Sequence, residues 1–285
     1  ATGCNANHID SITLEDMQTG VAAVTFSNAY GAGQTNADNN VGAVYARTTA
    51  SNTRAVWFNG YDATYPIKRG RVGHVNFIGP EECVSYGKYT EGCHVGDENS
   101  YYETTGNFAA ISIAGSGTDA FTHYRPTVRG RVKATARTGS GNGAVQILKT
   151  DGQGQTVFDG HVLASGAEGI ITYQSKNLRC AGTVEETALS GLLIRVVDDA
   201  NYRGHLNIRW RGTMKNIAKT NTGASSGVRP VAESGTPAIQ SIHIEAGSEF
   251  LDTQGSPTTS VMNFGTADFV SIDAHYWTAI AAPLI

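Results

Sequence analysis

Two carboxylates and a histidine lie around the glycines of two successive repeats of the chain. When the repeats are aligned on their glycines, we expect Asp159, His161 and Glu185 to face outwards on neighbouring turns. Glycoside cleavage uses one carboxyl group as acid and another as base or nucleophile, about 5 to 9.5 Å apart. These residues are the candidate catalytic groups, with His161 as a proton shuttle. The alternative is a ladder of opposite charges that only stabilises neighbouring strands.

Arginines and aromatic residues supply the candidate substrate contacts. Arg129 and Arg211 precede the glycine in the repeats that flank the acidic groups. Flat aromatic rings stack well on sugar rings, and three lie close together in the sequence at Trp57, Tyr61 and Tyr65. Aromatic residues are also common in strands and at subunit contacts, so a purely structural role stays open.

The repeats are marked by the phrase Gly-x-Val or Gly-x-Met. Its glycines are Gly130, Gly160, Gly182 and Gly212, which are 30, 22 and 30 residues apart. A second phrase, a glycine that opens an apolar run, alternates with it at positions 143, 169 and 191. Short strands separated by turns at a period of 20 to 30 residues are typical of a solenoid, in which each turn buries its apolar side on the next.

Alternation within the strands favours a coil with a filled core. Val132, Ala134 and Ala136 share one side of their strand, while Arg131 and Lys133 share the other. The fold class predicted is therefore all-β, a parallel β-helix, with a β-sandwich as the alternative. The four residues 69–72 also repeat residues 129–132 at a distance of 60, so we expect these two segments to be equivalent and the coil to begin before residue 70.

The composition agrees with a turn-rich β-protein. The 285 residues include 34 glycines and only 7 prolines, and 16% are charged, so Thr, Ser, Asn and Gln must supply much of the polar surface. Such surfaces are common on extracellular and viral proteins. A net charge of −4 without a basic run argues against nucleic-acid binding, and the lack of an 18-residue apolar stretch argues against membrane insertion.

The sequence predicts neither a metal nor a cofactor. It contains no CxxC pair, no phosphate loop and no nucleophile elbow. Cys83 and Cys93 flank a polar loop and form either a disulfide or two free thiols. Cys180 falls on an inward position and is expected to be buried.

Three regions follow from these patterns. Residues 1–245 are predicted to form the coil. A region near 78–105, rich in Gly, Glu, Tyr and Asn, is expected to project from it as an insertion that carries binding residues. Because a solenoid exposes its core at its ends, residues 246–285 are predicted to form a C-terminal cap that also serves oligomerisation.

The Gly-x-Val turns, the Gly-opened aliphatic runs and the Thr, Ser and Asn corners over about residues 9 to 245 resemble a known class. They are similar to the right-handed parallel β-helices of the pectin-lyase-like family, in particular bacteriophage tailspikes. The resemblance is architectural, and no signature motif assigns a role to a residue. It implies a right-handed coil, a homotrimer on a virion surface or otherwise extracellular, and a bacterial surface polysaccharide as partner.

Three functions are considered for this chain. The first is a tailspike that depolymerises a capsular or O-antigen polysaccharide, as a hydrolase or a lyase. The second is a non-catalytic fibre or adhesin of the same architecture. The third is a structural coat protein, built on a sandwich if the repeats are coincidental. A groove with paired carboxylates favours the first, a shallow aromatic site the second, and large apolar subunit contacts the third.

Overall fold

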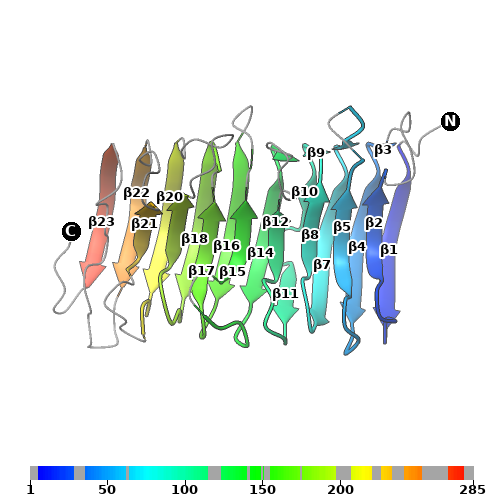
Figure 1. The fold of residues 1–285 in the computed structure, drawn as a ribbon, viewed down its shortest axis with the longest axis horizontal. Helices are drawn as coiled ribbons and strands as arrows, with labels where there is room; N and C mark the ends of the chain where they lie inside the picture. Colours follow the sequence, from blue (N-terminus) through cyan, green and yellow to red (C-terminus); the bar gives the residue numbers. More distant parts are fainter. Residues whose placement is uncertain are drawn as a thin grey trace.

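The computed structural model describes residues 6–28, 36–61, 64–114, 123–139, 142–148, 150, 155–173, 175–196, 207–219, 226–232, 241–251 and 269–278. In these residues all regular structure is β-strand and no helix occurs. The strands are stacked along the length of an elongated molecule (Figure 1). The prediction of an all-β chain is confirmed.

The largest sheet has 11 strands within the described residues. Its members are β1 (His8–Glu15), β4 (Asn40–Arg47), β7 (Arg71–Gly79), β10 (His94–Val95), β11 (Tyr101–Thr104), β14 (Thr127–Lys133), β16 (Thr156–Leu163), β18 (Leu178–Glu185), β20 (Ile208–Lys215), β22 (Ile242–Leu251) and β23 (Val270–Thr278). The short strands β10 and β11 share one level of the sheet, between β7 and β14.

Two further sheets complete the coil. The 8-stranded sheet comprises β2 (Ala22–Ser27), β5 (Arg54–Asn59), β8 (Val84–Lys88), β12 (Ile111–Ala114), β15 (Gly143–Leu148), β17 (Glu168–Tyr173), β19 (Leu192–Val196) and β21 (Val228–Ala232). The 4-stranded sheet comprises β3 (Asn36–Ala37), β6 (Ile67–Lys68), β9 (Thr90–Glu91) and β13 (His123–Tyr124).

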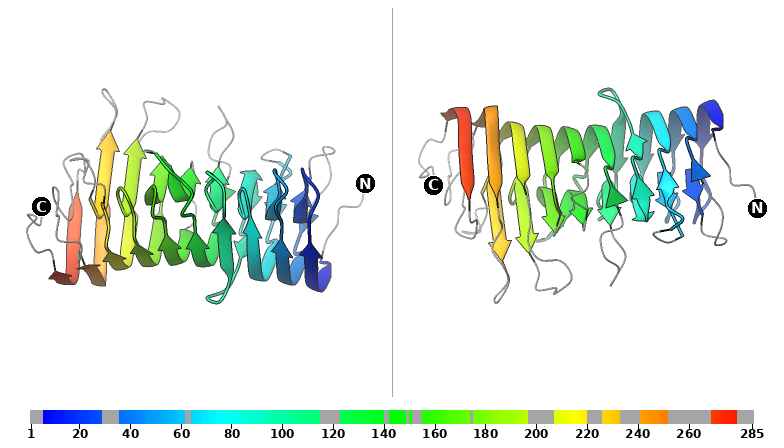
Figure 2. Two further views of the ribbon diagram at one scale, coloured as in Figure 1. Left: turned by 90° about the horizontal axis from the view of Figure 1, so that it is seen from below. Right: turned by 90° about the horizontal axis from the view of Figure 1, so that it is seen from above.

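The chain visits the three sheets in turn. After β4, β5 and β6 it returns one level higher, where β7 pairs with β4, β8 with β5 and β9 with β6. Each such turn is called a rung below, and neighbouring rungs are about 4.8 Å apart. Figure 2 shows the rungs following one another from the N-terminal to the C-terminal end. Because every strand pair between described residues is parallel, the architecture is a β-solenoid, and the β-sandwich alternative is wrong.

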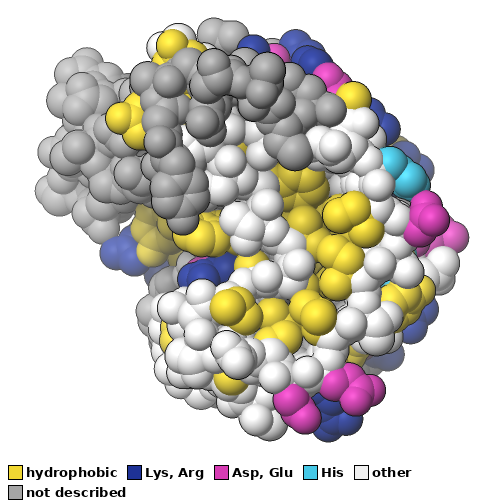
Figure 3. All heavy atoms as spheres, turned by 90° about the vertical axis from the view of Figure 1, so that its right-hand side faces the viewer, with side chains coloured by type: hydrophobic (Ala, Val, Ile, Leu, Met, Phe, Trp, Pro, Cys, Tyr) yellow, Lys and Arg dark blue, Asp and Glu magenta, His cyan; other side chains and the backbone are white. Residues whose placement is uncertain are grey.

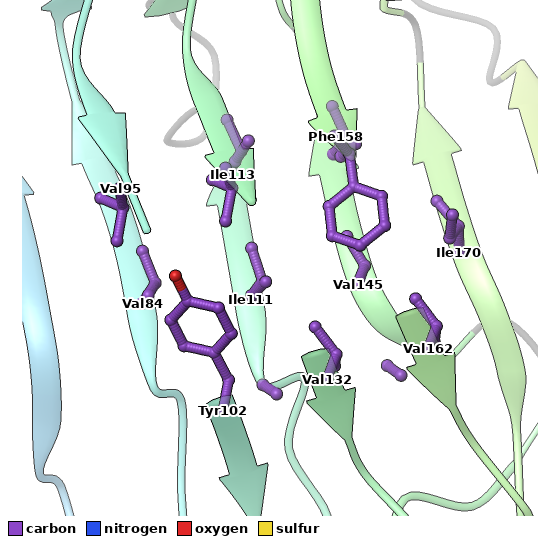
Figure 4. Close-up of a cluster of buried hydrophobic side chains, with 14 of the residues drawn as sticks. Val84, Val95, Tyr102, Ile111, Ile113, Val132, Val145, Phe158, Val162 and Ile170 are labelled. Carbon is purple, nitrogen blue, oxygen red and sulfur yellow. The ribbon is translucent and has the colours of Figure 1, made fainter. Parts of the chain in front are cut away.

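Inward side chains stack into rows that form the core. Val72, Val95 and Val128 pair in register on successive rungs and are fully buried. Val132 and Val162 continue the same arrangement, and Figure 4 shows them among the buried aliphatic and aromatic side chains between the two long sheets. Burying a side chain of this size contributes about 1.5–3 kcal/mol. The aliphatic rows therefore hold the rungs in register.

The alignment of repeats on their glycines is confirmed. Gly130 pairs with Gly160, Gly160 with Gly182, and Gly182 with Gly212, so these four residues form a column across β14, β16, β18 and β20. The unequal spacing of the glycines is absorbed outside the 11-stranded sheet, where the strands keep a common register. Positions before and after each glycine therefore face the neighbours that the sequence predicts.

The match between residues 69–72 and 129–132 does not reflect equivalent positions. Val72 pairs with Val95, and Val95 pairs with Val128, so Val72 corresponds to Val128, four residues before the expected partner. The coil does begin before residue 70, since β1 and β4 belong to the same sheet. The expected equivalence is wrong because the intervening rungs do not each contain 30 residues.

Gly70 and Gly130, the two glycines of this false match, are needed for different reasons. A Cβ on Gly70 would meet the ring of Phe58, so this glycine makes room for an aromatic core side chain just before β7. Gly130 lies within β14, where its φ of +128° is one that glycine adopts readily. Packing alone thus requires glycine at position 70, whereas backbone conformation and close packing against Ser100 both require it at position 130.

Residues 78–105 form a rung of the coil, and the expectation of a projecting insertion is not met. Strands β8, β9, β10 and β11 fall in this region and join all three sheets. Tyr86 and Tyr102 point inwards and are fully buried beside Val84, Cys93 and Val95. The segment is poor in aliphatic residues because aromatic side chains fill its share of the core.

The coil continues past residue 245. Strand β22 spans that position and pairs in parallel with β20, and β23 pairs in parallel with β22. Of the predicted cap, residues 246–251 and 269–278 therefore extend the 11-stranded sheet. The rest of the segment lies outside the described residues.

Three of the four cysteines lie in the described residues, and all three are free and buried. The disulfide alternative for Cys83 and Cys93 is therefore wrong. Cys180 occupies the inward position that the sequence predicts, and it packs in the core. The remaining cysteine, Cys4, lies outside the described residues.

The N-terminal end of the coil exposes part of its apolar interior. Figure 3 looks onto this end and shows hydrophobic side chains gathered in the middle, with charged side chains around the rim. Ile9, Leu14 and Val21 are among the large apolar residues that stay exposed. Within the described residues, β1 is the terminal strand of its sheet and pairs with β4 alone.

Candidate functional site

A groove of about 870 Å³ crosses the outer face of the 11-stranded sheet. Its floor follows the glycine positions of successive rungs, from Gly42 on β4 to Gly182 on β18. The remaining lining residues are polar or charged: His74, His94, Asp97, Glu98, Asn99, Arg129, Arg131, Asp159, His161 and Thr183. The groove therefore offers many hydrogen-bonding groups along a floor without side chains.

The glycine column leaves no room for side chains because neighbouring rungs approach too closely. The carbonyl oxygen of Gly130 occupies the place that a Cβ on Gly160 would take, and Gly160 stands in the same relation to Gly182. Gly42 and Gly73 repeat this contact on β4 and β7. The glycines are thus needed for rung stacking, and a bare backbone floor on the outer face is the consequence.

A five-residue loop, residues 96–100, rises between β10 and β11 and forms one wall of the groove. Ser100 holds it in place: its hydroxyl accepts a hydrogen bond from the Val75 amide at 3.0 Å, and its carbonyl accepts one from the Arg131 amide at 2.7 Å. Tyr102 donates its hydroxyl proton to the Arg129 carbonyl at 2.9 Å. These bonds replace the ladder that the loop interrupts between β7 and β14.

Asp97 is the best anchored carboxylate of the groove. His74 Nδ1 lies 3.2 Å from its Oδ1, and the Ser100 hydroxyl and the Asn99 amide donate to the same carboxylate at 2.9 and 3.0 Å. Burial alone would raise the pKa of Asp97, but the hydrogen bonds from His74 and Ser100 outweigh it and hold the pKa below its ordinary value. Asp97 is therefore ionised at neutral pH.

His94 lines the groove beside this loop and stays neutral. Its Nε2 is 2.9 Å from the Gly96 carbonyl oxygen, the geometry of a donated N–H bond. Burial lowers the pKa of His94, and the nearby charges of Arg129 and Arg71 lower it further, against the opposing effect of the Gly96 hydrogen bond. The ring is a neutral hydrogen-bonding group at pH 7.

Asp159 and Arg129 face each other on adjacent rungs. They pair in register, and Asp159 Oδ2 lies 4.0 Å from Arg129 Nε. Both side chains are about half exposed, so this contact is loose and contributes little to stability. Their remaining hydrogen-bonding capacity is directed at the groove.

Glu185 binds His161, and it is remote from Asp159. Its Oε1 lies 2.8 Å from His161 Nε2. In register Glu185 pairs with Leu163, four residues beyond Asp159, so their Cα atoms are offset by about 13 Å along the strand direction. Glu185 directs its carboxylate to His161 and does not line the groove. The structure brings Asp159 and His161 into one groove, and Glu185 supports His161 from outside it.

The other predicted contact residues lie away from the groove. Arg211 is on β20, one rung beyond the last lining strand. Trp57 lies on β5 in the 8-stranded sheet, and Tyr61 follows that strand with 44% of its surface exposed. The Tyr65 carbonyl accepts a hydrogen bond from the Asn28 side chain. These aromatic residues do not share a surface with Asp159 and His161.

Sequence reasoning missed several groove residues. His94 belongs to a rung whose glycine, Gly96, lacks the Gly-x-Val phrase, whereas His74 lies within such a phrase, Gly73-His74-Val75, which the match on Gly70 passed over. Tyr45 was missed too: it is 42% exposed, and its ring centroid lies 5.4 Å from that of His74. Tyr45 therefore provides an aromatic surface beside one end of the groove.

The described residues hold no cluster of three His, Cys, Asp or Glu side chains arranged to bind a metal ion. A helix capable of crossing a membrane is likewise not found in this part of the chain.

Comparison with protein-family models, with curated proteins and with solved structures finds no match to this chain. The resemblance to phage tailspikes therefore stays a prediction from the sequence pattern.

Proposed function

We propose that the protein is an extracellular or virion-surface solenoid that binds polysaccharide in the groove of its 11-stranded sheet. The observation that carries this proposal is the groove itself, an open channel of about 870 Å³ lined by histidine, carboxylate, amide and guanidinium groups over a bare glycine floor. A glycan presents many hydroxyl groups along an extended chain, and such a channel offers hydrogen bonds to several units at once. Tyr45 adds a ring for stacking.

The test is binding to an array of bacterial polysaccharides by the purified chain and by two tryptophan variants. Asn99→Trp places a large side chain in the groove and should abolish binding. Thr135→Trp adds the same side chain to an exposed turn outside the groove and should leave binding unchanged. Equal binding by all three proteins, or no binding by any, would contradict the proposal.

Cleavage of the bound glycan is the second candidate, and the shared position of Asp97 and Asp159 favours it. Both line the groove: Asp97 lies in the loop after β10, and Asp159 lies on β16, two rungs further along the coil. Two carboxyl groups about 6.5–9.5 Å apart can act on a sugar with an intervening water. In this scheme ionised Asp97 is the base and Asp159 the acid.

Release of reducing ends from an array-identified polysaccharide tests this scheme. Asp97→Asn and Asp159→Asn should each reduce release by at least a hundredfold while binding is retained. Unchanged release in either variant, or no release by the unmodified protein, would refute cleavage and leave glycan binding as the proposed function.

The proposal also includes the finer architecture that the resemblance implies: a right-handed coil, a C-terminal cap within residues 246–285, and a homotrimer. Small-angle scattering combined with light scattering tests the assembly. An elongated particle of about three chain masses agrees with it, and an elongated particle of one chain mass would contradict the trimer while leaving the coil intact.

A further inference from the structure

Arg131 is a cation of the groove whose side chain has no partner among the described residues. It is exposed on β14, and its backbone amide is bound by the Ser100 carbonyl, which fixes the position of the residue. In register it lies between Tyr101 on one rung and His161 on the next. Neither neighbour neutralises its charge.

The acidic groups nearest along these rungs are engaged elsewhere. Tyr101 donates its hydroxyl proton to Glu103 at 2.7 Å, and Glu103 also pairs with Lys133 at 2.7 Å. On the other side, His161 is held by Glu185. Because these pairs form at the edge of the groove, the guanidinium of Arg131 keeps its hydrogen-bonding capacity for a ligand.

The acidic groups inside the groove do not neutralise the charge of Arg131 either. Asp97 is bound by His74 and Ser100, and Asp159 faces Arg129. Glu98 is exposed at the tip of the 96–100 loop and forms no ion pair within the described part of the chain. Among the described lining residues, Arg131 is therefore a cation and Glu98 an anion without an ion-pair partner.

A guanidinium group in this position matches a carboxylate. Its planar N–H pairs bind both oxygens of a carboxylate at once, and a partly enclosed site strengthens such a bond. The chain as a whole has a net charge of −4, so it does not attract polyanions through its overall field. Any affinity for an acidic ligand must come from a local site.

We infer that the groove takes a glycan that bears carboxylate groups and that Arg131 binds one of these carboxylates. The inference rests on the proposed function and names its ligand class. From Gly42 to Gly182 the groove spans the six strand levels from β4 to β18, about 24 Å, with Arg131 in its middle part. The ligand is therefore an oligomer or polymer of an acidic sugar that lies along the coil axis.

Titration calorimetry with three defined probes tests the inference: oligogalacturonate, which carries carboxylates, dextran sulfate oligomers, which carry sulfates, and neutral dextran oligomers. The proteins compared are the unmodified chain, Arg131→Gln, Arg131→Lys, Glu98→Gln and the control Lys215→Gln. Lys215 is exposed on the same sheet, outside the groove, and its replacement changes the net charge by the same amount as Arg131→Gln. Thermal melting of each variant verifies that it folds.

For oligogalacturonate we expect Arg131→Gln to weaken binding about tenfold or more, since a hydrogen-bonded charge is lost. The affinity of Arg131→Lys should lie between those of the unmodified protein and Arg131→Gln, because lysine keeps the charge but cannot form the bidentate hydrogen bond. Glu98→Gln should tighten binding about twofold by removing a like charge. Lys215→Gln should leave it unchanged. Affinity should also fall as salt is added.

Several results would overturn the inference, and they separate it from the proposed function. Equal effects of Arg131→Gln and Lys215→Gln would show that Arg131 binds no carboxylate. Binding to dextran sulfate without binding to oligogalacturonate would assign the groove to sulfated ligands. Binding to neutral glycans alone, on the probes or on the array, would refute the acidic ligand and leave the glycan site standing. No binding to any glycan would refute both.

Discussion

The two long sheets of the coil use their outer faces in different ways. In the 11-stranded sheet, strand β14 alternates: Val128 and Val132 are buried, whereas Arg129 and Arg131 are exposed. In the 8-stranded sheet, strand β17 is buried at five consecutive positions, with only its last residue intermediate. The first sheet combines a core face with a polar, grooved face, whereas β17 of the second sheet is buried on both faces.

This contrast shows which strands serve packing alone and which also present residues that can bind a ligand. Parallel strands that are buried on both faces have continuous apolar sequences, whereas strands with one solvated face alternate apolar and polar residues. The Gly-opened runs belong to the first kind and the Gly-x-Val strands to the second. The groove lies on the alternating sheet, where outward residues are free to vary in charge.

The largest effect should come from placing a charge on the outer face of each sheet. Leu193 points away from the core row of Leu192 and Ile194 but is only 3% exposed, so Leu193→Asp buries an unpaired carboxylate and should cost about 3–5 kcal/mol. Thr183→Asp, on the outer face of the 11-stranded sheet, should cost less than about 1 kcal/mol. Denaturant unfolding measures both. Similar losses in the two variants would remove the distinction between the sheets.

The glycine column should not tolerate even the methyl group of an alanine. Gly160→Ala forces a Cβ against the Gly130 carbonyl, and we expect a loss of about 3 kcal/mol because rungs must separate. Gly247→Ala is the matched control: its site is open, and only a φ of +82° is unfavourable, for about 1 kcal/mol. A smaller loss for Gly160→Ala than for Gly247→Ala, in the same unfolding assay, would show that the column does not need glycine for stacking.

Acidification should weaken the groove floor through His94. Because burial holds the folded-state pKa of His94 below its ordinary value of 6.5, the unfolded chain takes up this proton first as the pH falls. This contribution to stability is complete above about pH 6.5 and decreases below it. Asp97 and Glu103, whose pKa values are also lowered, contribute stability that is lost only below their ordinary values of 3.8 and 4.5.

His94→Gln isolates this step, because glutamine keeps a hydrogen-bond donor and does not titrate. Between pH 7 and pH 5 the melting temperature of the variant should fall less than that of the unmodified protein. An equal fall in both proteins would show that His94 titrates normally in the folded state.

The smallest effect should come from the pair formed by His161 and Glu185. Both side chains are partly exposed, so a double-mutant cycle with His161→Gln and Glu185→Gln should give a coupling energy of about 0.5 kcal/mol. Glycan binding should respond more strongly to His161→Gln, because His161 lines the groove and Glu185 does not. Equal losses of binding in the two single variants would place Glu185 in the site as well.

Much of the coil was accessible from the sequence because its signals are local. The register of Gly130, Gly160 and Gly182 follows from a repeated phrase, and the alternation after each glycine identifies the inward side. The rung at 78–105 was not recognised, since Tyr86 and Tyr102 replace aliphatic core residues and carry no periodic aliphatic signal. Aromatic composition alone does not reveal whether a tyrosine points inwards or outwards.

The candidate site was predictable only where it lies on the repeats. Asp159 and His161 were found because they flank an aligned glycine, and the register of Leu163 with Glu185 was itself predicted. The alignment did not reveal that Asp159 and Glu185 are offset by four residues along the strand direction. The wall that contains Asp97 was missed as part of the groove, because it depends on a loop that interrupts the ladder and has no counterpart in the other repeats.

The most direct test of the account is to locate a bound oligosaccharide on the protein by crystallography, with a glycan that binds on the array. The account predicts ordered sugar units along the glycine column between Gly42 and Gly182, within hydrogen-bonding distance of Arg131 and His161. Sugar bound on the 8-stranded sheet beside Trp57, with the groove empty, would contradict it.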